Sequence, residues 1–431
     1  MKKVGFCTLG CKVNQYETEA MITLFKDRGF EIADFDDKCD IYVINTCTVT
    51  GTGDRKSRQM IHRAHSKNRD AVIIVTGCYS QVSPESVAAL EGVSLVVGTS
   101  ERSRIVDMAE KYMRQREQKI NVGDIMKKRD YEELWISSYE DKTRAFVKIE
   151  DGCTEFCSYC IIPYARGPVR SRSPENITKE VTSLAKNGYR EVVLTGIHIG
   201  SYGRDLKDKT LLDAIVAANE VEDIKRIRLG SVEPRILTKE FIDEISKMPK
   251  VCDHFHISLQ SGCARTLKAM NRKYTTDEYR LAVKNLRLAY KNPAITTDII
   301  AGFPGETEED FKESVEFMKE INFSEAHIFP YSPRKGTKAA QMEGQIDKKT
   351  KNARAKIMIE EAKKLHEEYV ASFVGSEAEV LFERNTKDDM YEGHMSNYIT
   401  VRAKSDEDVS HMFRKVKITG INNGIAIGEI V

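Results

Sequence analysis

The stretch EDGCTEFCSYCIIPYARG, residues 150–167, places three cysteines within eight positions at the spacing CxxxCxxC. It overlaps the end of RAFVKIE, residues 144–150, which we predict to be a β-strand. Cys153, Cys157 and Cys160 should therefore lie in a loop at the carboxyl end of that strand. No Cys or His occurs in the 30 residues after Cys160, so the loop by itself offers a metal three thiolates.

This strand is the first of six strand candidates that alternate with predicted helices between about residues 144 and 340. Such alternation predicts an α/β fold with parallel strands and right-handed connections. Six units form an open, partial (β/α)6 barrel, short of the eight that close one, with ligand-binding residues at the carboxyl ends of the strands. The candidates are RAFVKIE, EVVLTG, RIRLGS, HFHISLQ, TTDIIAG and EAHIFPYS.

The first segment, to about residue 124, also alternates apolar runs with helical stretches and predicts an N-terminal parallel α/β sheet. Cys11 comes after KKVGFCT, Cys47 after IYVINT and Cys78 after AVIIVTG. Because the carboxyl ends of parallel strands share one edge, we expect these three thiols to converge. Cys7 and Cys39 lack this placement, and we expect them to be ordinary thiols.

A charged helix over about residues 348–370 leads into the last segment of the chain. There the apolar residues alternate with period two in EAEVLFE, NYITVRA, RKVKITG and GIAIGEI. This pattern predicts a small antiparallel β-barrel or sandwich. We therefore expect three domains, at residues 1–124, 139–369 and 371–431.

The composition is that of a globular protein, with 431 residues, 41% hydrophobic and 31% charged. The start MKKVGFCTLGCKVNQ lacks a signal-peptide core, and no later stretch approaches the roughly 20 apolar residues of a membrane span. We expect a cytoplasmic protein with no membrane partner, in which ten cysteines suit metal binding or catalysis more than disulfides. Because the formal net charge is only +1, a nucleic-acid partner would require local basic patches.

The three thiolates of the cysteine loop limit which metal ion or cluster it can bind. Thiolates bind zinc or iron–sulfur clusters, and a structural zinc site needs four ligands where this loop gives three. On a four-iron cluster, three thiolates leave one iron open to a substrate or cofactor. An accidental or zinc-binding cysteine group is the alternative.

CTEFCSYC resembles the signature loop of the radical S-adenosylmethionine enzymes, and the trio Cys11, Cys47 and Cys78 resembles the second cluster site of the methylthiotransferases among them. LGCKVNQYE, CIIPYARGPVRSR and LTGIHIGSYG are most similar to the branch that acts on threonylcarbamoyladenosine in tRNA. The resemblance covers essentially the whole chain, because the last segment is similar to the RNA-binding TRAM domain.

The resemblance implies two [4Fe-4S] clusters and S-adenosyl-L-methionine as cofactors. The cluster on Cys153, Cys157 and Cys160 would donate an electron to S-adenosylmethionine, and the resulting radical would remove hydrogen from C2 of an adenine. The cluster on the other three cysteines would carry the sulfur to be inserted, and a second S-adenosylmethionine would supply the methyl group. A reducing electron donor and a sulfur source are then required partners.

Further residues suit a bound S-adenosylmethionine. By resemblance, Thr195 and Gly196 would contact its methionine amino group. Polar groups at other strand ends suit a ribose and a carboxylate, glycines allow close approach to an adenine, and aromatic rings could stack beside it. These residues are Ser231, Glu233, Ser258 and Gln260, then Gly302 with Gly305, and Phe329 or Tyr331. We expect His198 and His256 to be structural.

Two basic stretches could meet RNA phosphates. Six Lys/Arg and no acid occur between Arg55 and Arg69, and Arg166, Arg170 and Arg172 follow the cysteine loop. From Ala371 on, seven Lys/Arg stand against ten Asp/Glu. RNA binding by this last segment would therefore rest on shape, on stacking by residues such as Tyr398, and on a patch around Arg414, Lys415 and Lys417.

The sequence thus predicts an enzyme that makes the 2-methylthio derivative of threonylcarbamoyladenosine, on the 3′ side of the anticodon in tRNA. The anticodon loop is a reasonable substrate because single-stranded loops expose their bases. Two alternatives share the chemistry, acting on isopentenyladenosine in tRNA or on an aspartate of a ribosomal protein. A non-catalytic iron–sulfur or zinc RNA-binding protein is the alternative of another class.

Overall fold

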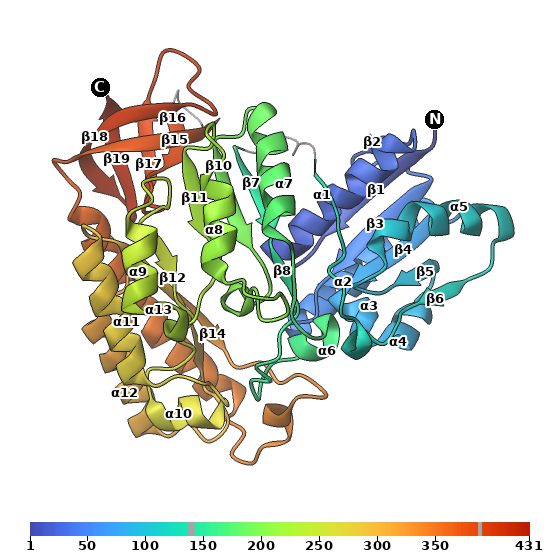
Figure 1. Ribbon diagram of the computed structural model, residues 1–431. Coiled ribbons are helices and arrows are strands. Elements are labelled where there is room, and N and C mark those ends of the chain that lie inside the picture. The colour runs from blue at the N-terminus through green and yellow to red at the C-terminus, as the bar shows by residue number, and fades with distance from the viewer. Residues whose placement is uncertain (137–142, 387–389) are drawn as a thin grey trace.

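The computed structural model describes residues 1–136, 143–386 and 390–431, and the expected boundary at residue 139 lies outside them. The chain passes from an N-terminal sheet through a central open barrel to a small C-terminal barrel (Figure 1). Within these ranges, no helix has the length and apolar character needed to cross a membrane.

The N-terminal sheet has six strands, all parallel, in the order β2-β1-β3-β4-β5-β6. The parallel sheet is as predicted, but only three of its strands were foreseen. The strands β2 and β6 have three residues each, too few for a periodic signal, and β5 is a short buried run. The strands are β1 (Lys3–Thr8), β2 (Glu31–Ala33), β3 (Ile41–Thr46), β4 (Val72–Gly77), β5 (Val93–Val97) and β6 (Lys119–Asn121). The helices are α1 (Lys12–Asp27), α2 (Gly51–Lys67), α3 (Cys78–Val82), α4 (Pro84–Ala88) and α5 (Ile105–Gln115).

All six predicted strands of the central barrel are present. They form two parallel sheets, β11-β10-β7 and β12-β13-β14, which parallel bridges at Ile227–Val251 and Val232–Ile257 connect. The barrel is open because β7 and β14 are edge strands, and the helices lie outside the strands (Figure 1). The strands are β7 (Arg144–Lys148), β10 (Glu191–Thr195), β11 (Arg226–Leu229), β12 (His254–His256), β13 (Ala294–Ala301) and β14 (Glu325–Pro330).

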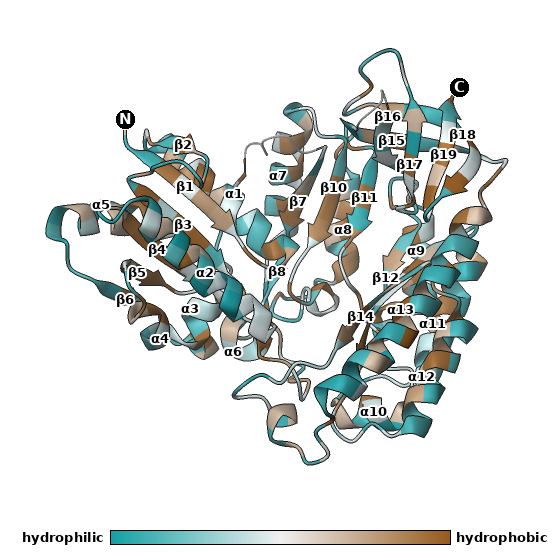
Figure 2. Ribbon diagram, turned by 180° about the vertical axis from the view of Figure 1, so that it is seen from behind, coloured by the Kyte–Doolittle hydropathy of each residue, from teal (hydrophilic) through white to brown (hydrophobic). Residues whose placement is uncertain are grey.

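The outer helices are amphipathic. Buried positions of α11 and α12 belong to the central core, whereas much of their outward surface is hydrophilic (Figure 2). A short hairpin of β8 (Glu150–Asp151) and β9 (Arg170–Ser171) flanks the cysteine loop. The helices are α6 (Ile162–Arg166), α7 (Pro174–Lys186), α8 (Leu211–Asn219), α9 (Lys239–Ser246), α10 (Ala264–Ala269), α11 (Thr276–Ala289), α12 (Glu308–Ile321) and α13 (Lys348–Ala371).

The C-terminal segment is a closed five-stranded barrel of order β15-β16-β17-β19-β18. The expectation of a wholly antiparallel barrel needs one correction, because β17 and β19 pair in parallel to close it. The strand β16 was not foreseen. The strands are β15 (Glu377–Asn385), β16 (Met390–His394), β17 (Thr400–Lys404), β18 (Phe413–Asn422) and β19 (Ile425–Ile430).

The C-terminal barrel packs on the amino ends of the central strands. Arg144, the first residue of β7, donates to Tyr398 Oη at 2.9 Å, and Arg228 of β11 donates to the carbonyl oxygens of Met395 and Ser396. The helix α6, beyond the cysteine loop, lies at the opposite end (Figure 1). The C-terminal barrel therefore stands away from the carboxyl ends where ligands are expected.

Candidate metal centres and ligand site

The loop trio, Cys153, Cys157 and Cys160, lies between β8 and α6, and each of its thiols is half-buried. Backbone hydrogen bonds hold the loop on both sides. Cys153 N donates to Gly167 O at 2.9 Å, and Ser158 N donates to Met270 O at the end of α10, also at 2.9 Å. The three ligands therefore come from one loop, which is fixed both by Gly167, close in the sequence, and by Met270, which is distant in the sequence.

The assembled trio, Cys11, Cys47 and Cys78, comes from three strand ends. Cys11 is the N-cap of α1, Cys47 follows β3 and Cys78 opens α3, and the strands β1, β3 and β4 are adjacent. A Cβ added to Gly10, whose φ is +110°, would lie only 2.9 Å from the Cβ of Cys47. Glycine at position 10 therefore allows the turn before Cys11 to pass close to Cys47.

Neither trio has the geometry of a single-ion site. Among the described residues, the three sulfurs of neither trio all lie within 4.8 Å of one another. Ligands about 2.3 Å from a tetrahedral zinc would stand under about 4 Å apart. The wider spacing suits a larger group such as a four-iron cluster. Burial raises the pKa of Cys47 to about 11 and that of Cys160 to about 12, so ligation would displace their protons.

Arg166, at the end of α6 and six residues after Cys160, contacts the assembled trio. It is fully buried, and its Nε donates to Cys78 Sγ at 3.3 Å. Its Nη2 donates to Asn14 Oδ1 at 2.6 Å and to Glu17 Oε2 at 3.1 Å. Asn14 and Glu17 belong to α1, which begins just after Cys11. The Arg166 guanidinium therefore links α6, which follows the loop trio, to α1 of the assembled trio.

The prediction that Arg166, Arg170 and Arg172 meet RNA phosphates is wrong. All three side chains are buried and have acidic partners. Arg170 lies 3.4 Å from Asp151, and Arg172 pairs with Glu180. A buried cation of this kind neutralises carboxylates inside the protein and is not available to a bound polyanion.

A second buried arginine serves the loop trio, and the sequence analysis missed it. Arg272 Nη1 donates to Cys157 Sγ at 3.2 Å, and its Nη2 lies 2.8 Å from Glu233 Oε1. Glu233 also faces His198 Nε2 at 3.4 Å. The predicted cofactor residue Glu233 is therefore already paired, and His198 has a structural partner as expected. Arg272 stands in no recognisable motif, and only the fold brings it to Cys157.

Glu150 and Gly196 form a small polar recess beside the cysteine loop. A Cβ added to Gly196 would lie 2.7 Å from Glu150 Oε2, which accepts from His198 N at 2.7 Å. Glu150 Oε1 is buried and has no hydrogen-bond partner among the described residues. Burial raises the pKa of Glu150 to about 8. An orphaned carboxylate oxygen next to Thr195 and under a glycine suits an ammonium group, which fits the amino group of S-adenosylmethionine.

Phe329 and Tyr331, the two aromatic candidates on β14 and just after it, differ in access. Phe329 is 50% exposed, whereas Tyr331 is buried against Phe303 with ring centroids 5.5 Å apart. Only Phe329 can therefore stack on a ligand.

The other predicted contacts also differ in access. Ser231 is exposed, and Ser258 and Gln260 are half-buried at the carboxyl end of β12. Gly302 has φ +73°, and a Cβ there would lie 2.3 Å from Lys351 Cγ. The position that a side chain would take at Gly302 is therefore filled by the Lys351 stem, which requires a glycine there.

The basic helix α2 presents its cations to solvent. The side chains of Arg55, Lys56, Arg58 and Arg63 are exposed, as are those of Lys67 and Arg69. Asp36 pairs with Arg63 and lies 3.9 Å from Lys67. In the described part of the chain, neither Arg55 nor Lys56 has an ion-pair partner, so their charges are the freest on this helix.

Tyr398 is not free to stack on RNA, so that prediction is wrong. Its ring stacks with His254 at 5.1 Å and with His394 at 4.7 Å between centroids. The guanidinium groups of Arg144 and Arg228 also lie over the ring. Tyr398 instead fastens the C-terminal barrel to the central strands.

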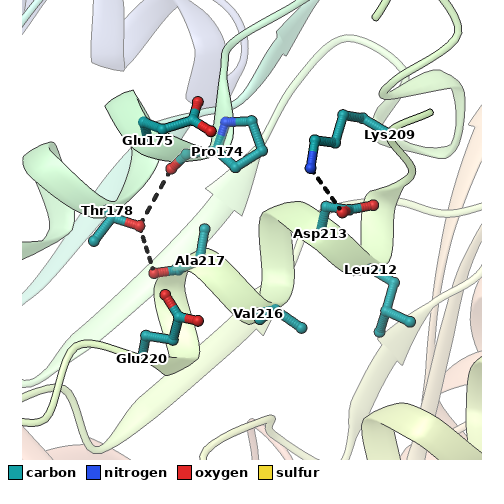
Figure 3. A pocket seen from close by; sticks show the side chains of 9 residues that line it. All are labelled: Pro174, Glu175, Thr178, Lys209, Leu212, Asp213, Val216, Ala217 and Glu220. Atoms are coloured by element: carbon teal, nitrogen blue, oxygen red, sulfur yellow. Dashed lines mark hydrogen bonds and ion pairs between the residues drawn. The ribbon is translucent and has the colours of Figure 1, made fainter. Parts of the chain in front are cut away.

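Two further features stand apart from the trios. A pocket on the outer surface lies between α7 and α8 (Figure 3), lined by Pro174, Glu175, Thr178, Lys209, Leu212, Asp213, Val216, Ala217 and Glu220.

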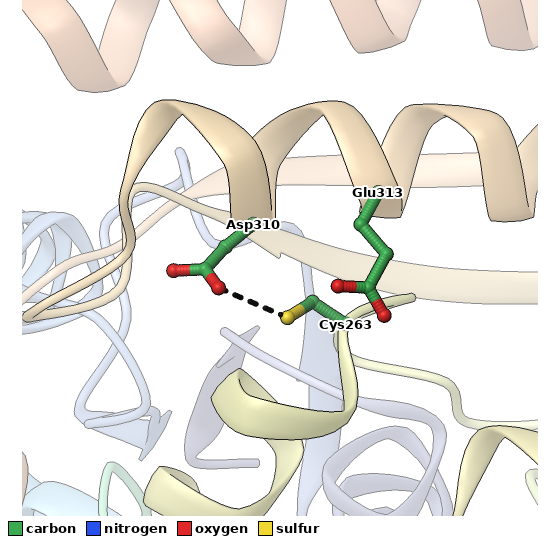
Figure 4. Close-up of side chains that lie close together, drawn as sticks. All are labelled: Cys263, Asp310 and Glu313. Atoms are coloured by element: carbon green, nitrogen blue, oxygen red, sulfur yellow. Dashed lines mark hydrogen bonds between the residues drawn. The ribbon is translucent and has the colours of Figure 1, made fainter.

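Cys263, Asp310 and Glu313 bring three ligand atoms within 4.8 Å of one another (Figure 4). However, the Cys263 thiol donates to Asp310 Oδ1 at 3.2 Å, and burial raises its pKa to about 11. Asp310 also pairs with Arg265 and caps α12, so this group stabilises a helix start.

Family models match two parts of the chain, and curated relatives match nearly all of it. Residues 147–318 match the family model described as Radical SAM superfamily, and residues 3–98 match the one described as Uncharacterized protein family UPF0004. The threonylcarbamoyladenosine tRNA methylthiotransferase MtaB of Bacillus subtilis (strain 168) is 46% identical, over 97% of this chain and 94% of that protein. The tRNA-2-methylthio-N(6)-dimethylallyladenosine synthase of Alkaliphilus oremlandii (strain OhILAs) is 34% identical, over 100% of this chain and 93% of that protein.

Among solved structures, the radical S-adenosylmethionine methyltransferase TsrM of Kitasatospora setae, with tryptophan substrate and an S-adenosylmethionine analogue bound, has a TM-score of 0.57 at 16% identity. The alignment covers 77% of this chain and 75% of that one. At this identity the likeness concerns the fold.

Proposed function

This chain belongs to the radical S-adenosylmethionine tRNA methylthiotransferases, and we propose that it converts N6-threonylcarbamoyladenosine, on the 3′ side of the anticodon in tRNA, into its 2-methylthio derivative. The observation that carries the proposal is the junction of two cysteine trios at Arg166, because sulfur insertion requires two iron–sulfur centres at one site. The 46% identity to a relative named for threonylcarbamoyladenosine supports the choice of substrate.

In this proposal, the loop trio and the assembled trio each hold a [4Fe-4S] cluster. When bound, the clusters and S-adenosylmethionine supply the radical chemistry, the inserted sulfur and the methyl group. The chain's own residues bind and orient. Glu150, Thr195 and Gly196 hold the methionine ammonium group, and Ser231, Ser258 and Gln260 meet the ribose and carboxylate. Phe329 stacks beside a base, and Arg166 and Arg272 donate to one sulfur of each trio.

The tRNA would approach along the exposed cations of α2, which begins four residues after Cys47. The five-stranded barrel is compatible with a TRAM domain, with Arg414 and Lys417 as the remaining patch, since Lys415 pairs with Glu377. A reducing electron donor, a sulfur source and a cytoplasmic location complete the proposal.

We also propose the domain boundaries 1–124, 139–369 and 371–431. Separate apolar cores in the N-terminal sheet and in the C-terminal barrel support them. Tyr16 and Ala20 of α1 pack into the central core, so the first two domains share an apolar interface.

A second candidate function is methylthiolation of dimethylallyladenosine in tRNA, which the 34% identical Alkaliphilus relative favours. The chemistry at C2 would be the same, and only the substituent on N6 would differ.

Mass spectrometry of tRNA nucleosides tests the proposal. Cells that lack this protein should accumulate threonylcarbamoyladenosine, and a plasmid copy should restore its 2-methylthio derivative. A copy carrying Cys157→Ala is the matched control and should not restore it. Restoration of methylthio-dimethylallyladenosine instead would favour the second candidate.

A further inference from the structure

The strands β12, β13 and β14 carry a polar face to which the proposed function assigns no role. Phe255, Ile257 and Ile299 are buried in the core beneath the outer helices. The alternate residues face the other way. The side chain of His327 is 51% exposed and that of Asp298 is 34% exposed, although both lie within paired strands. Solvent-accessible space therefore lies in front of this face.

The side chains of this face are linked to one another. His256 Nε2 lies 3.4 Å from Asp298 Oδ2, and its Nδ1 lies 3.0 Å from Thr296 Oγ1. The His256 and His327 rings stack at 6.3 Å between centroids. His256 therefore lies between Asp298 and Thr296, with one ring nitrogen towards each. Asp298 keeps its second oxygen for another partner, and His327, whose Nδ1 lies 4.0 Å from Glu325 Oε1, keeps its Nε2.

The register places this group directly below the candidate stacking residue. Asp298 pairs with His327, and Ile300, two residues further along β13, pairs with Phe329. At about 3.3 Å per residue, the level of Asp298 and His327 lies about 7 Å from that of Phe329 along the strands. The sequence predicts the adenine of S-adenosylmethionine beside Phe329. We instead place the target adenosine of the tRNA on Phe329, from which a substituent of several bonds could reach Asp298 and His327.

We propose that Asp298 and His327 bind the threonylcarbamoyl chain of the modified adenosine and so determine substrate specificity. This inference rests on the proposed function. The chain carries ureido N–H donors, a hydroxyl and a carboxylate. Asp298 accepts from the N–H groups and His327 donates to the carboxylate, while His256 positions Asp298. A dimethylallyl chain has no polar atoms, so it would leave these groups desolvated and unpaired, which a site built for hydrogen bonding disfavours strongly.

The test is RNA binding to the anaerobically reconstituted protein, measured by fluorescence anisotropy. Three anticodon stem-loops of one sequence carry adenosine, threonylcarbamoyladenosine or dimethylallyladenosine at the target position. The wild type should prefer the threonylcarbamoyl RNA over the unmodified RNA by about ten- to a hundredfold. Asp298→Asn and His327→Leu should remove most of that preference and leave the Kd of the unmodified RNA within about twofold.

Asp277→Asn is the matched control, because Asp277 is an exposed carboxylate on α11 whose partner is Arg280. It should keep the wild-type preference. The inference is overturned if Asp298→Asn and His327→Leu keep the preference, or if they weaken all three RNAs equally. A wild-type protein that prefers the dimethylallyl RNA would overturn the proposed function itself. A preference for the threonylcarbamoyl RNA in the wild type and in both variants would overturn only the assignment of the specificity residues.

Discussion

The two cysteine trios offer the same three ligands but depend on different parts of the molecule. The loop trio lies within one loop, held by backbone bonds to Gly167 and Met270. The assembled trio needs three strand ends in register and a buried guanidinium from another part of the chain. The cysteines of the first are neighbours along the chain, whereas those of the second are brought together only by tertiary packing. The assembled trio should therefore be the more sensitive to substitutions far from its ligands.

The largest expected effect separates the two trios by function. Replacing Cys11, Cys47 and Cys78 by Ala should abolish the methylthio product and leave deoxyadenosine formation from S-adenosylmethionine intact. Iron should fall from about eight to about four atoms per chain. The matched variant without Cys153, Cys157 and Cys160 should lose both activities. Loss of deoxyadenosine formation in the first variant, with its loop cluster retained, would contradict this division.

The next effect concerns Arg166. Arg166→Leu leaves Glu17 and Asp151 with less compensation in a buried site, which should cost about 3–5 kcal/mol of unfolding free energy in urea titrations. Iron should be lost mainly from the assembled trio. Arg280→Leu is the control, since Arg280 is 40% exposed beside Glu320 and should cost under about 1 kcal/mol. An equal loss of unfolding free energy in both variants would show that the buried Arg166 pairs stabilise the fold no more than an exposed ion pair.

A smaller effect should appear in acid. Burial alone would raise the pKa of Glu17, but Arg102, Arg166 and Lys148 lower it from 4.5 to about 2. The lowered pKa contributes stability that is complete above about pH 4.5 and is lost as the pH falls towards 2, at most about 3 kcal/mol. Urea unfolding at several pH values should show this slope in the wild type. The slope should be shallower in Glu17→Gln, and an unchanged slope would assign the acid sensitivity elsewhere.

The smallest expected effect concerns the exposed cations of α2. Arg55→Gln or Lys56→Gln should each reduce the slope of log affinity for tRNA against log salt by about one unit. Arg63→Gln should change it less, because Asp36 already neutralises Arg63. The measurement compares the slope of log tRNA affinity against log salt among the three variants. The iron content of each variant is the control for an intact protein. Identical slopes in wild type and all three variants would leave α2 as a solvated helix face.

The sequence predicted correctly the features that depend on local patterns, and it failed for side chains whose role depends on whether they are buried. The six central strands and the strand-end positions of three cysteines could be read from period and spacing. The roles of Arg166, Arg170 and Arg172 could not, because a run of arginines looks the same whether water or a buried carboxylate surrounds it. Tyr398 failed for the same reason, since packing covers a ring that composition leaves open.

By itself, the sequence determined the order of the three segments and the parallel sheets, and it suggested the two cysteine trios that we propose as ligands, because these follow from spacing along the chain and from the period of apolar residues. Only the tertiary structure decided which charges are free and which are paired. It brought Arg272 to Cys157, Glu150 under Gly196, and Asp298 beside His256. The physical reason is that hydrogen bonds and desolvation act over a few ångströms in space, whatever the distance along the chain.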